Sequence, residues 1–158
     1  MAGRKKKEPV DYISVLKRLA ESGVRNHLPD NDTDDVLAPL EIRIKKLFEL
    51  AEKSKKNVGN MLFFVMYDIE DDKVRRYVVK YLEKRGCIRI QKSIFLANQP
   101  ISVFEDIKKD LEEVQGVYEN ADSILVVPIT VDYLNAMKII GNNINVDVIT
   151  RNKTTLFF

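Results

Sequence analysis

Apolar residues fall in blocks along the middle of the chain, and the spacing within the blocks changes from strand-like to helix-like. Met61 to Tyr67 is an uncharged run that ends at Asp68, which is typical of a buried strand. From about Asp72 to Arg85 the apolar residues recur at helical spacing, and Gly86 is well placed to end that helix. The pattern predicts a strand followed by a helix.

The same alternation continues toward the C-terminal half of the chain. Cys87 to Leu96 predicts a strand that is bent or split around Lys92, with a third strand near 93–98. A helix to about Val114 follows, opened by a capping-box pattern at Ser102 to Glu105, and Ser123 to Val127 predicts a fourth strand. The order β-α-β-β-α-β predicts an α+β fold, the ferredoxin-like sandwich, for residues 60–158.

The first strand has apolar residues on both sides, although two helices of such a sandwich cover only one face of its sheet. The other face needs its own cover. A second copy of the same sheet is the simplest cover, which predicts a twofold homodimer. Residues 144–150 alternate as a strand does, and 154–158 could form one more.

Composition excludes several classes of protein. The chain has 158 residues, one cysteine (Cys87) and one histidine (His27), so neither an internal disulfide nor a Cys/His zinc site within one chain is expected. We expect a cytoplasmic protein, since no signal-peptide core follows Met1 and no apolar run could cross a bilayer. Nucleotide-binding loop motifs are absent from the sequence. The net charge of +2 is too small to argue for nucleic-acid binding.

A family resemblance rests on three features of the central region. The YDI-x-DD segment (Tyr67 to Asp72), the helix after it and the QKSIF strand (Gln91 to Phe95) together resemble the CRISPR-associated protein two (Cas-two) family. The resemblance covers about residues 60–158. It implies a CRISPR adaptation protein, a homodimer that bridges integrase subunits and binds duplex protospacer DNA, with a C-terminal strand exchanged between partners.

Asp68 is the strongest candidate for chemistry, and by resemblance it matches the aspartate at the end of the family's first strand. In a twofold dimer, two Asp68 carboxylates facing each other need a cation or a shared proton. Mg²⁺ at the dimer axis would meet that need. The alternative is that Asp68 only ends the strand. For Asp71 and Asp72, capping of the following helix is the preferred interpretation.

Basic residues gather on the helix after Asp68 and on the next strand. We expect them to contact nucleic-acid phosphates, with a solvated helix face as the alternative. They are Lys73, Arg75, Arg76, Lys80, Lys84, Arg89 and Lys92. Arg75 and Arg76 match the family's basic pair, but spacing does not tell which one points at phosphate.

Residues 1–58 form a predicted helical extension that the resemblance does not cover. Two amphipathic stripes, in 10–23 and in 36–55, predict two helices. Neither helix buries its stripe alone. They are expected to pack on the main domain, on each other across the dimer or on the integrase.

Three functions compete. The first is the architectural adaptor that the resemblance implies. The second is a metal-dependent endonuclease, acting on RNA or DNA through paired Asp68 carboxylates. The third is a small sensor or RNA-recognition domain. It ranks last because an RNA-recognition sheet would expose aromatic residues, whereas the first strand is apolar on both faces. Core packing near the dimer contact is the preferred interpretation for Tyr67 and Phe95, with stacking on a base as the alternative. Ser93 lacks a histidine base within this domain.

Overall fold

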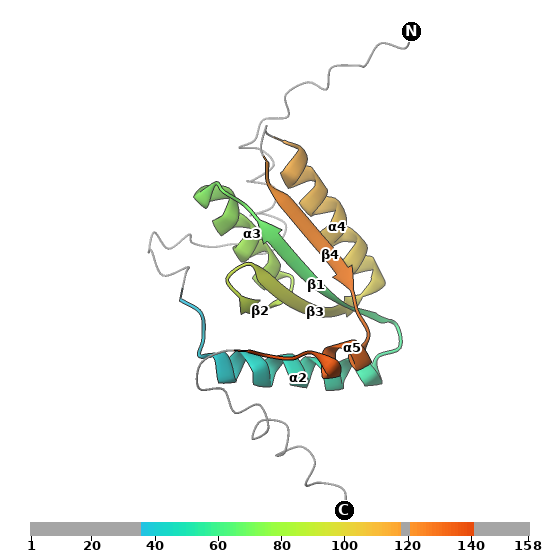
Figure 1. Cartoon of the computed structure of the whole chain (residues 1–158). Coiled ribbons are helices and arrows are strands. Elements are labelled where there is room, and N and C mark those ends of the chain that lie inside the picture. Colours follow the sequence, from blue (N-terminus) through green and yellow to red (C-terminus); the bar gives the residue numbers. More distant parts are fainter. Residues whose placement is uncertain (1–35, 118–120, 141–158) are drawn as a thin grey trace, which may run out of the picture.

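The computed structural model describes residues 36–117 and 121–140, which form one sheet with helices on both faces (Figure 1). The elements in chain order are α2 (Leu40–Lys56), β1 (Asn60–Asp68), α3 (Asp72–Lys84), β2 (Ile88–Gln91), β3 (Ile94–Pro100), α4 (Ile101–Gly116), β4 (Ser123–Pro128) and α5 (Val131–Ala136). The predicted β-α-β-β-α-β order is confirmed, with α2 before it and α5 after it. In these two ranges, no helix combines the length and apolar character needed to cross a membrane.

The four strands form an antiparallel sheet in the order β2-β3-β1-β4. The central strand, β1, pairs with β3 on one side and β4 on the other, so that Phe64 lies opposite Leu96 and Val127. This arrangement fits the ferredoxin-like fold expected from the order of elements.

One face of the sheet packs against α3 and α4. Phe63, Val65 and Tyr67 of β1 are buried on this face. The rings of Phe63 and Phe104 meet edge to face, with centroids 4.8 Å apart, a favourable geometry for aromatic pairs. Tyr67 and Phe95 are both buried in this core, which confirms their expected packing role.

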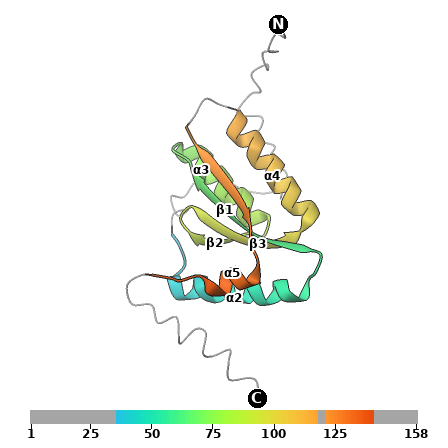
Figure 2. The same ribbon diagram turned by 45° about the vertical axis from the view of Figure 1, so that its right-hand side comes forward.

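The other face is covered in part by α2 and α5. Leu47 and Ala51 of α2 and Leu134 of α5 are buried in one cluster with sheet residues Leu62 and Leu96. Figures 1 and 2 both place α5 against α2, away from α3 and α4. The expectation that a second sheet supplies the cover is therefore corrected for this part of the face. One of the three alternatives for the extension, packing on the main domain, holds for α2.

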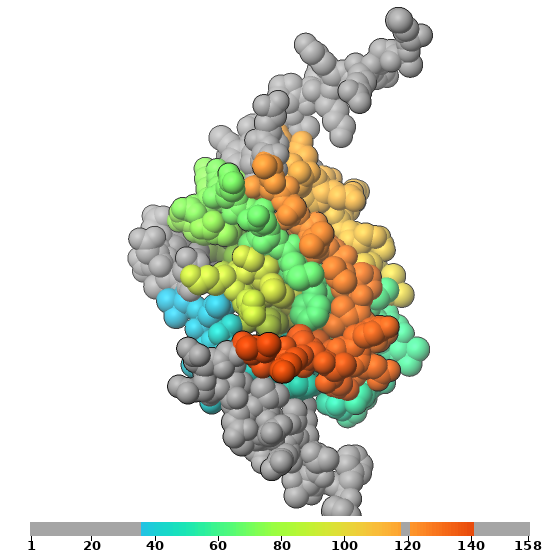
Figure 3. All heavy atoms as spheres, viewed as in Figure 1, coloured from blue at the N-terminus to red at the C-terminus, as the bar shows by residue number. Residues whose placement is uncertain are grey.

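The cover by α2 and α5 does not extend along the whole length of β1. On this face Leu62 is buried, Phe64 and Met66 are half-buried, and Asp68 is exposed. On β4 the exposed fraction rises from 38% at Val127 to 56% at Leu125. Figure 3 shows β1 (green) and β4 (orange) at the surface. We call the side chains of Phe64, Met66, Leu125 and Val127 the open patch.

Two predictions about where elements begin and end have different outcomes. The region around Lys92 is a turn between β2 and β3, as expected, and the pairing shifts register between Arg89 and Gln91. The predicted capping box at Ser102 to Glu105 is wrong. Helix α4 begins at Ile101 directly after Pro100, which still pairs within β3, and Pro100 occupies the N-cap position without a side-chain cap. Ser102 therefore lies within the helix.

Several expectations fall outside the described residues. They are the helix in 10–23, His27, and the strands in 144–150 and 154–158. The exchange of a C-terminal strand between partners falls there too.

Candidate functional site around Asp68

Asp68 is the last residue of β1 and its side chain is exposed. It lies opposite Ser123, the first residue of β4. Strand residues two apart share a face, so Asp68 lies on the same face as Met66 and Phe64. The carboxylate thus stands at the end of the open patch, away from the part that α2 and α5 cover.

The loop between Asp68 and α3 is held by two hydrogen bonds and by one buried side chain. The backbone N–H of Glu70 donates to Oδ1 of Asp122 over 3.0 Å, and Nη1 of Arg75 donates to the carbonyl of Ile69 over 3.2 Å. The Ile69 side chain itself is buried in the core. Asp68 is therefore followed by a loop whose backbone is held by Asp122 and Arg75.

Asp122 is a functional candidate that sequence reasoning missed. Its residue is only 9% exposed, and a buried carboxylate needs hydrogen-bond donors. The Glu70 N–H supplies one. The register of β4 against β1 brings Asp122 beside the loop. Nothing in the local sequence around Asp122 indicates that register.

Asp71 and Asp72 lie at the start of helix α3. Oδ1 of Asp71 accepts hydrogen bonds from the backbone N–H groups of Lys73 and Val74, over 2.8 and 2.9 Å. Asp71 is thus the N-cap of α3, and the capping interpretation is confirmed for it. Asp72 lies in the first turn and pairs with Arg75.

Arg75 and Arg76 have different environments in the structure. Arg75 is half-buried and binds the Ile69 carbonyl and Asp72, so its guanidinium holds the β1–α3 loop. Arg76 is exposed, and its Nε donates to the backbone carbonyl of Asp72 over 3.3 Å. The outer side of α3 carries four basic residues, which we call the α3 basic side: Lys73, Arg76, Lys80 and Lys84.

Arg85, at the end of α3, does not belong to that surface. Its Nη2 lies 3.2 Å from Oδ2 of Asp110 on α4, and the same oxygen accepts a hydrogen bond from the Tyr81 hydroxyl. Burial, together with this hydrogen bond to Asp110, raises the pKa of Tyr81. The cluster joins α3 to α4, and the Tyr81 hydroxyl within it keeps its proton.

The β2–β3 turn is tied to the residue before Asp68. The carbonyl oxygen of Lys92 accepts from the Tyr67 hydroxyl over 3.0 Å and from Nε and Nη2 of Arg89 over 3.2 and 2.8 Å. The N–H of Tyr67 donates to the Ser93 carbonyl over 3.1 Å. Arg89 therefore uses two of its donors to hold the turn, whereas the Lys92 side chain is exposed.

A comparison with protein families agrees with this geometry. Residues 61–137 match the family model described as CRISPR associated protein Cas2. The protein belongs to the Cas2 family. The match runs from the second residue of β1 to the residue after α5 and so includes the sheet, α3 and α4. Helix α2 lies outside it. No curated protein matches the chain. Membership in the Cas2 family implies a role in CRISPR adaptation.

The expected magnesium ion would need oxygen ligands from the Cas2 domain. Within the described parts of the chain, no three His, Cys, Asp or Glu side chains are grouped so as to hold a metal ion. Mg²⁺ typically binds one or two carboxylates and keeps several waters. The exposed Asp68 carboxylate supplies one such ligand. Asp68 would fit such an ion as one carboxylate ligand.

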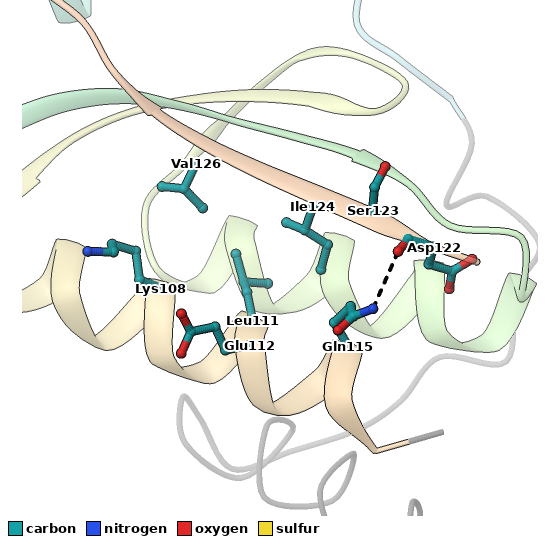
Figure 4. Close-up of a pocket in the computed structure, with 8 residues that line it drawn as sticks. All are labelled: Lys108, Leu111, Glu112, Gln115, Asp122, Ser123, Ile124 and Val126. Carbon is teal, nitrogen blue, oxygen red and sulfur yellow. Dashed lines mark hydrogen bonds between the residues drawn. The ribbon is translucent and has the colours of Figure 1, made fainter. Parts of the chain in front are cut away.

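A hollow of about 430 Å³ lies between α4 and β4 of the Cas2 domain (Figure 4). Leu111, Ile124 and Val126 line its apolar part, and Nε2 of Gln115 donates to the backbone carbonyl of Asp122 over 3.5 Å at one end. Among the described strands, β4 pairs only with β1. Its outer edge beside this hollow is therefore available for a further strand.

Proposed function

We propose that this Cas2-family protein works as a homodimer that bridges integrase subunits and binds duplex protospacer DNA. The α3 basic side carries the proposal. Its residues lie within the family match, and Lys73, Arg76 and Lys84 are exposed. Lysine and arginine side chains bind backbone phosphates without regard to base sequence, which suits a protein that must accept any protospacer.

The open patch supports a contact between two copies. Leu125 and Val127 are exposed next to the half-buried Phe64 and Met66, so apolar surface remains where α2 and α5 do not reach. Burial of such surface favours association. Asp68 stands at the end of this patch, so a twofold axis close by would bring two carboxylates together. The open edge of β4 is where an exchanged C-terminal strand would pair.

Metal-dependent cleavage of RNA or DNA is the second candidate, and the exposed position of Asp68 favours it. Two Asp68 carboxylates would hold Mg²⁺ at the dimer axis. A bound magnesium ion would polarise the phosphodiester and lower the pKa of a bound water molecule. Within the chain, Asp122 and Arg75 fix the loop behind Asp68. Their role would be to keep the two carboxylates in place.

The proposed binding of duplex DNA is tested by removing one positive charge from α3. Lys73→Gln is expected to weaken binding of a protospacer-length duplex and to lower the slope of log affinity against log salt by about 1, because one phosphate contact is lost. Lys109→Gln removes the same charge from an exposed site on α4 and serves as control. Equal affinities and slopes for both variants would contradict the proposal.

The role of the carboxylate is tested in a spacer-integration assay with the co-purified integrase. If Asp68→Ala still forms the complex and integrates DNA, the protein is an adaptor and Asp68 is dispensable for that role. If the variant assembles and integration fails, the metal site takes part in acquisition. Failure of the unmodified protein to bind the integrase would overturn the bridging role.

A further inference from the structure

A second basic site lies where the start of α2 meets the β2–β3 turn. These two segments, cyan and yellow-green, are neighbours in Figure 3. A hollow of about 470 Å³ opens between them. Its polar lining consists of Arg43 from α2, Gln91 at the end of β2, and Lys92 and Ser93 from the turn, and the rest of its lining is apolar. It is therefore separate from the α3 basic side.

The two cations of this hollow have no carboxylate partner in the described part of the chain. Nε of Arg43 donates to the backbone carbonyl of Ala38 over 2.7 Å, and its Nη1 donates to the carbonyl of Ile90. Both partners are neutral, so the positive charge of the guanidinium is not compensated by them. The Lys92 ammonium has no ion pair among the described residues, and no acid is among those that line the hollow.

The backbone that carries these donors is fixed. The bond to Ile90 ties Arg43 to β2. The Lys92 carbonyl accepts from Tyr67 and Arg89, and the Ser93 carbonyl accepts from the Tyr67 N–H. Donors on a fixed backbone lose less entropy when a ligand binds. The Arg43 guanidinium and the backbone of the turn are thus held in place before a ligand binds, and the hollow suits a ligand that accepts several hydrogen bonds and carries negative charge.

We propose that this hollow binds a phosphate group. A guanidinium, an ammonium, a hydroxyl and a side-chain amide are all donors to phosphate oxygens. The choice of a nucleic-acid phosphate as the occupant rests on the proposed function, whereas free phosphate would offer the same chemistry. Arg43 lies outside the residues that match the family model. Helix α2 therefore adds a phosphate site to the family's domain, at the turn whose carbonyls accept hydrogen bonds from Tyr67.

The test uses the full chain and three variants. Lys92→Gln and Arg43→Lys change the hollow, and Lys109→Gln is the charge-matched control on α4. The Lys92 side chain is exposed, so its replacement leaves the fold intact and decides the question even where Arg43→Lys unfolds. Circular dichroism checks the fold of each variant. Arg43→Lys keeps the charge but loses the planar fork of donors.

Two ligands are measured in parallel. In the first arm, the salt slope of duplex DNA binding is expected to fall by about 1 in Lys92→Gln, relative to the control. In the second arm, the melting temperature is followed in inorganic phosphate and in chloride at equal ionic strength. A rise in phosphate that Lys92→Gln abolishes, without a change in the DNA arm, identifies free phosphate as the occupant.

The two arms separate this inference from the proposed function. If the unmodified protein fails to bind duplex DNA, the proposed function is wrong, and the phosphate arm still decides whether the hollow is a site. If Lys92→Gln equals Lys109→Gln in both arms, the phosphate site itself is overturned.

Discussion

Around Asp68, neighbouring residues of one chemical type have different environments. Arg75 is half-buried and holds the Ile69 carbonyl, while Arg76 one residue later is exposed. One helical residue corresponds to a rotation of about 100°, which is enough to move a side chain from the core side of α3 to the outer side. Substitution of Arg75 is therefore expected to disturb the loop, and substitution of Arg76 to affect only surface contacts.

Cys87 gives a prediction about pH at this scale. The thiol is buried, and burial raises its pKa to about 12, against about 8.5 in an unfolded chain. The folded state therefore holds the proton more tightly. Its contribution to stability is complete below about pH 8.5 and is lost as the pH rises toward 12.

Urea unfolding between pH 8 and 10.5 checks this effect. Above pH 8.5 the free energy of unfolding of the unmodified protein should fall more steeply than that of Cys87→Ala, by up to about 1.4 kcal/mol per pH unit. The raised pKa of Tyr81 acts in the same direction in both proteins, so their difference isolates the thiol. Parallel pH profiles would show that Cys87 does not contribute.

At the scale of elements, α2 depends on the sheet for its stability. A helix of 17 residues is marginal in water by itself. Ile44, Leu47 and Ala51 are buried, and α2 contacts β2, β3, β1 and α5. The helix in turn shields Leu62 and Leu96 from water. We infer that α2 and the sheet unfold together.

Replacement of Leu47 tests this dependence. Leu47→Ala leaves a cavity under α2 and is expected to lower the free energy of unfolding by about 2–5 kcal/mol. Ile42→Ala, at an exposed position of the same helix, should change it by no more than about 0.5 kcal/mol. Chemical denaturation followed by circular dichroism measures both. A Leu47 variant as stable as the Ile42 variant would mean that α2 does not pack on the sheet in solution.

At the scale of the whole molecule, the two ends of one sheet face differ. One end is covered by α2 and α5, and the other end presents the open patch beside Asp68. A contact between two copies would then be limited to the half of the face formed by β1 and β4. That contact would be smaller than a full sheet-on-sheet interface and would leave α2 in place.

Self-association of the purified protein measures this contact. Leu125→Asp places a charge in the open patch and is expected to weaken dimerisation at least tenfold, for which a loss of about 1.4 kcal/mol suffices. Ile101→Asp introduces the same charge at an exposed apolar residue of α4 and should leave the dimer intact. Sedimentation velocity distinguishes the outcomes. A monomeric unmodified protein, or equal effects of both variants, would remove the open patch as the dimer surface.

Much of the fold follows from local signals in the sequence. The uncharged run of β1, the helical spacing of α3, the break at Lys92 and the cap at Asp71 each depend on residues close together in the chain. The capping box at Ser102 was wrong because β3 continues to Pro100 and the helix follows at once. There, strand pairing overrides a local motif.

By itself, the sequence determined the order of elements, the fold class, the family and the position of a carboxylate at the end of β1. Only the tertiary structure decided that α2 covers part of the sheet, that Asp122 holds the loop after Asp68 and that Arg43 lies near Lys92. These placements join residues about 50 positions apart. They depend on strand register and helix docking, which spacing along the chain does not encode, because many distant pairings satisfy the same local pattern.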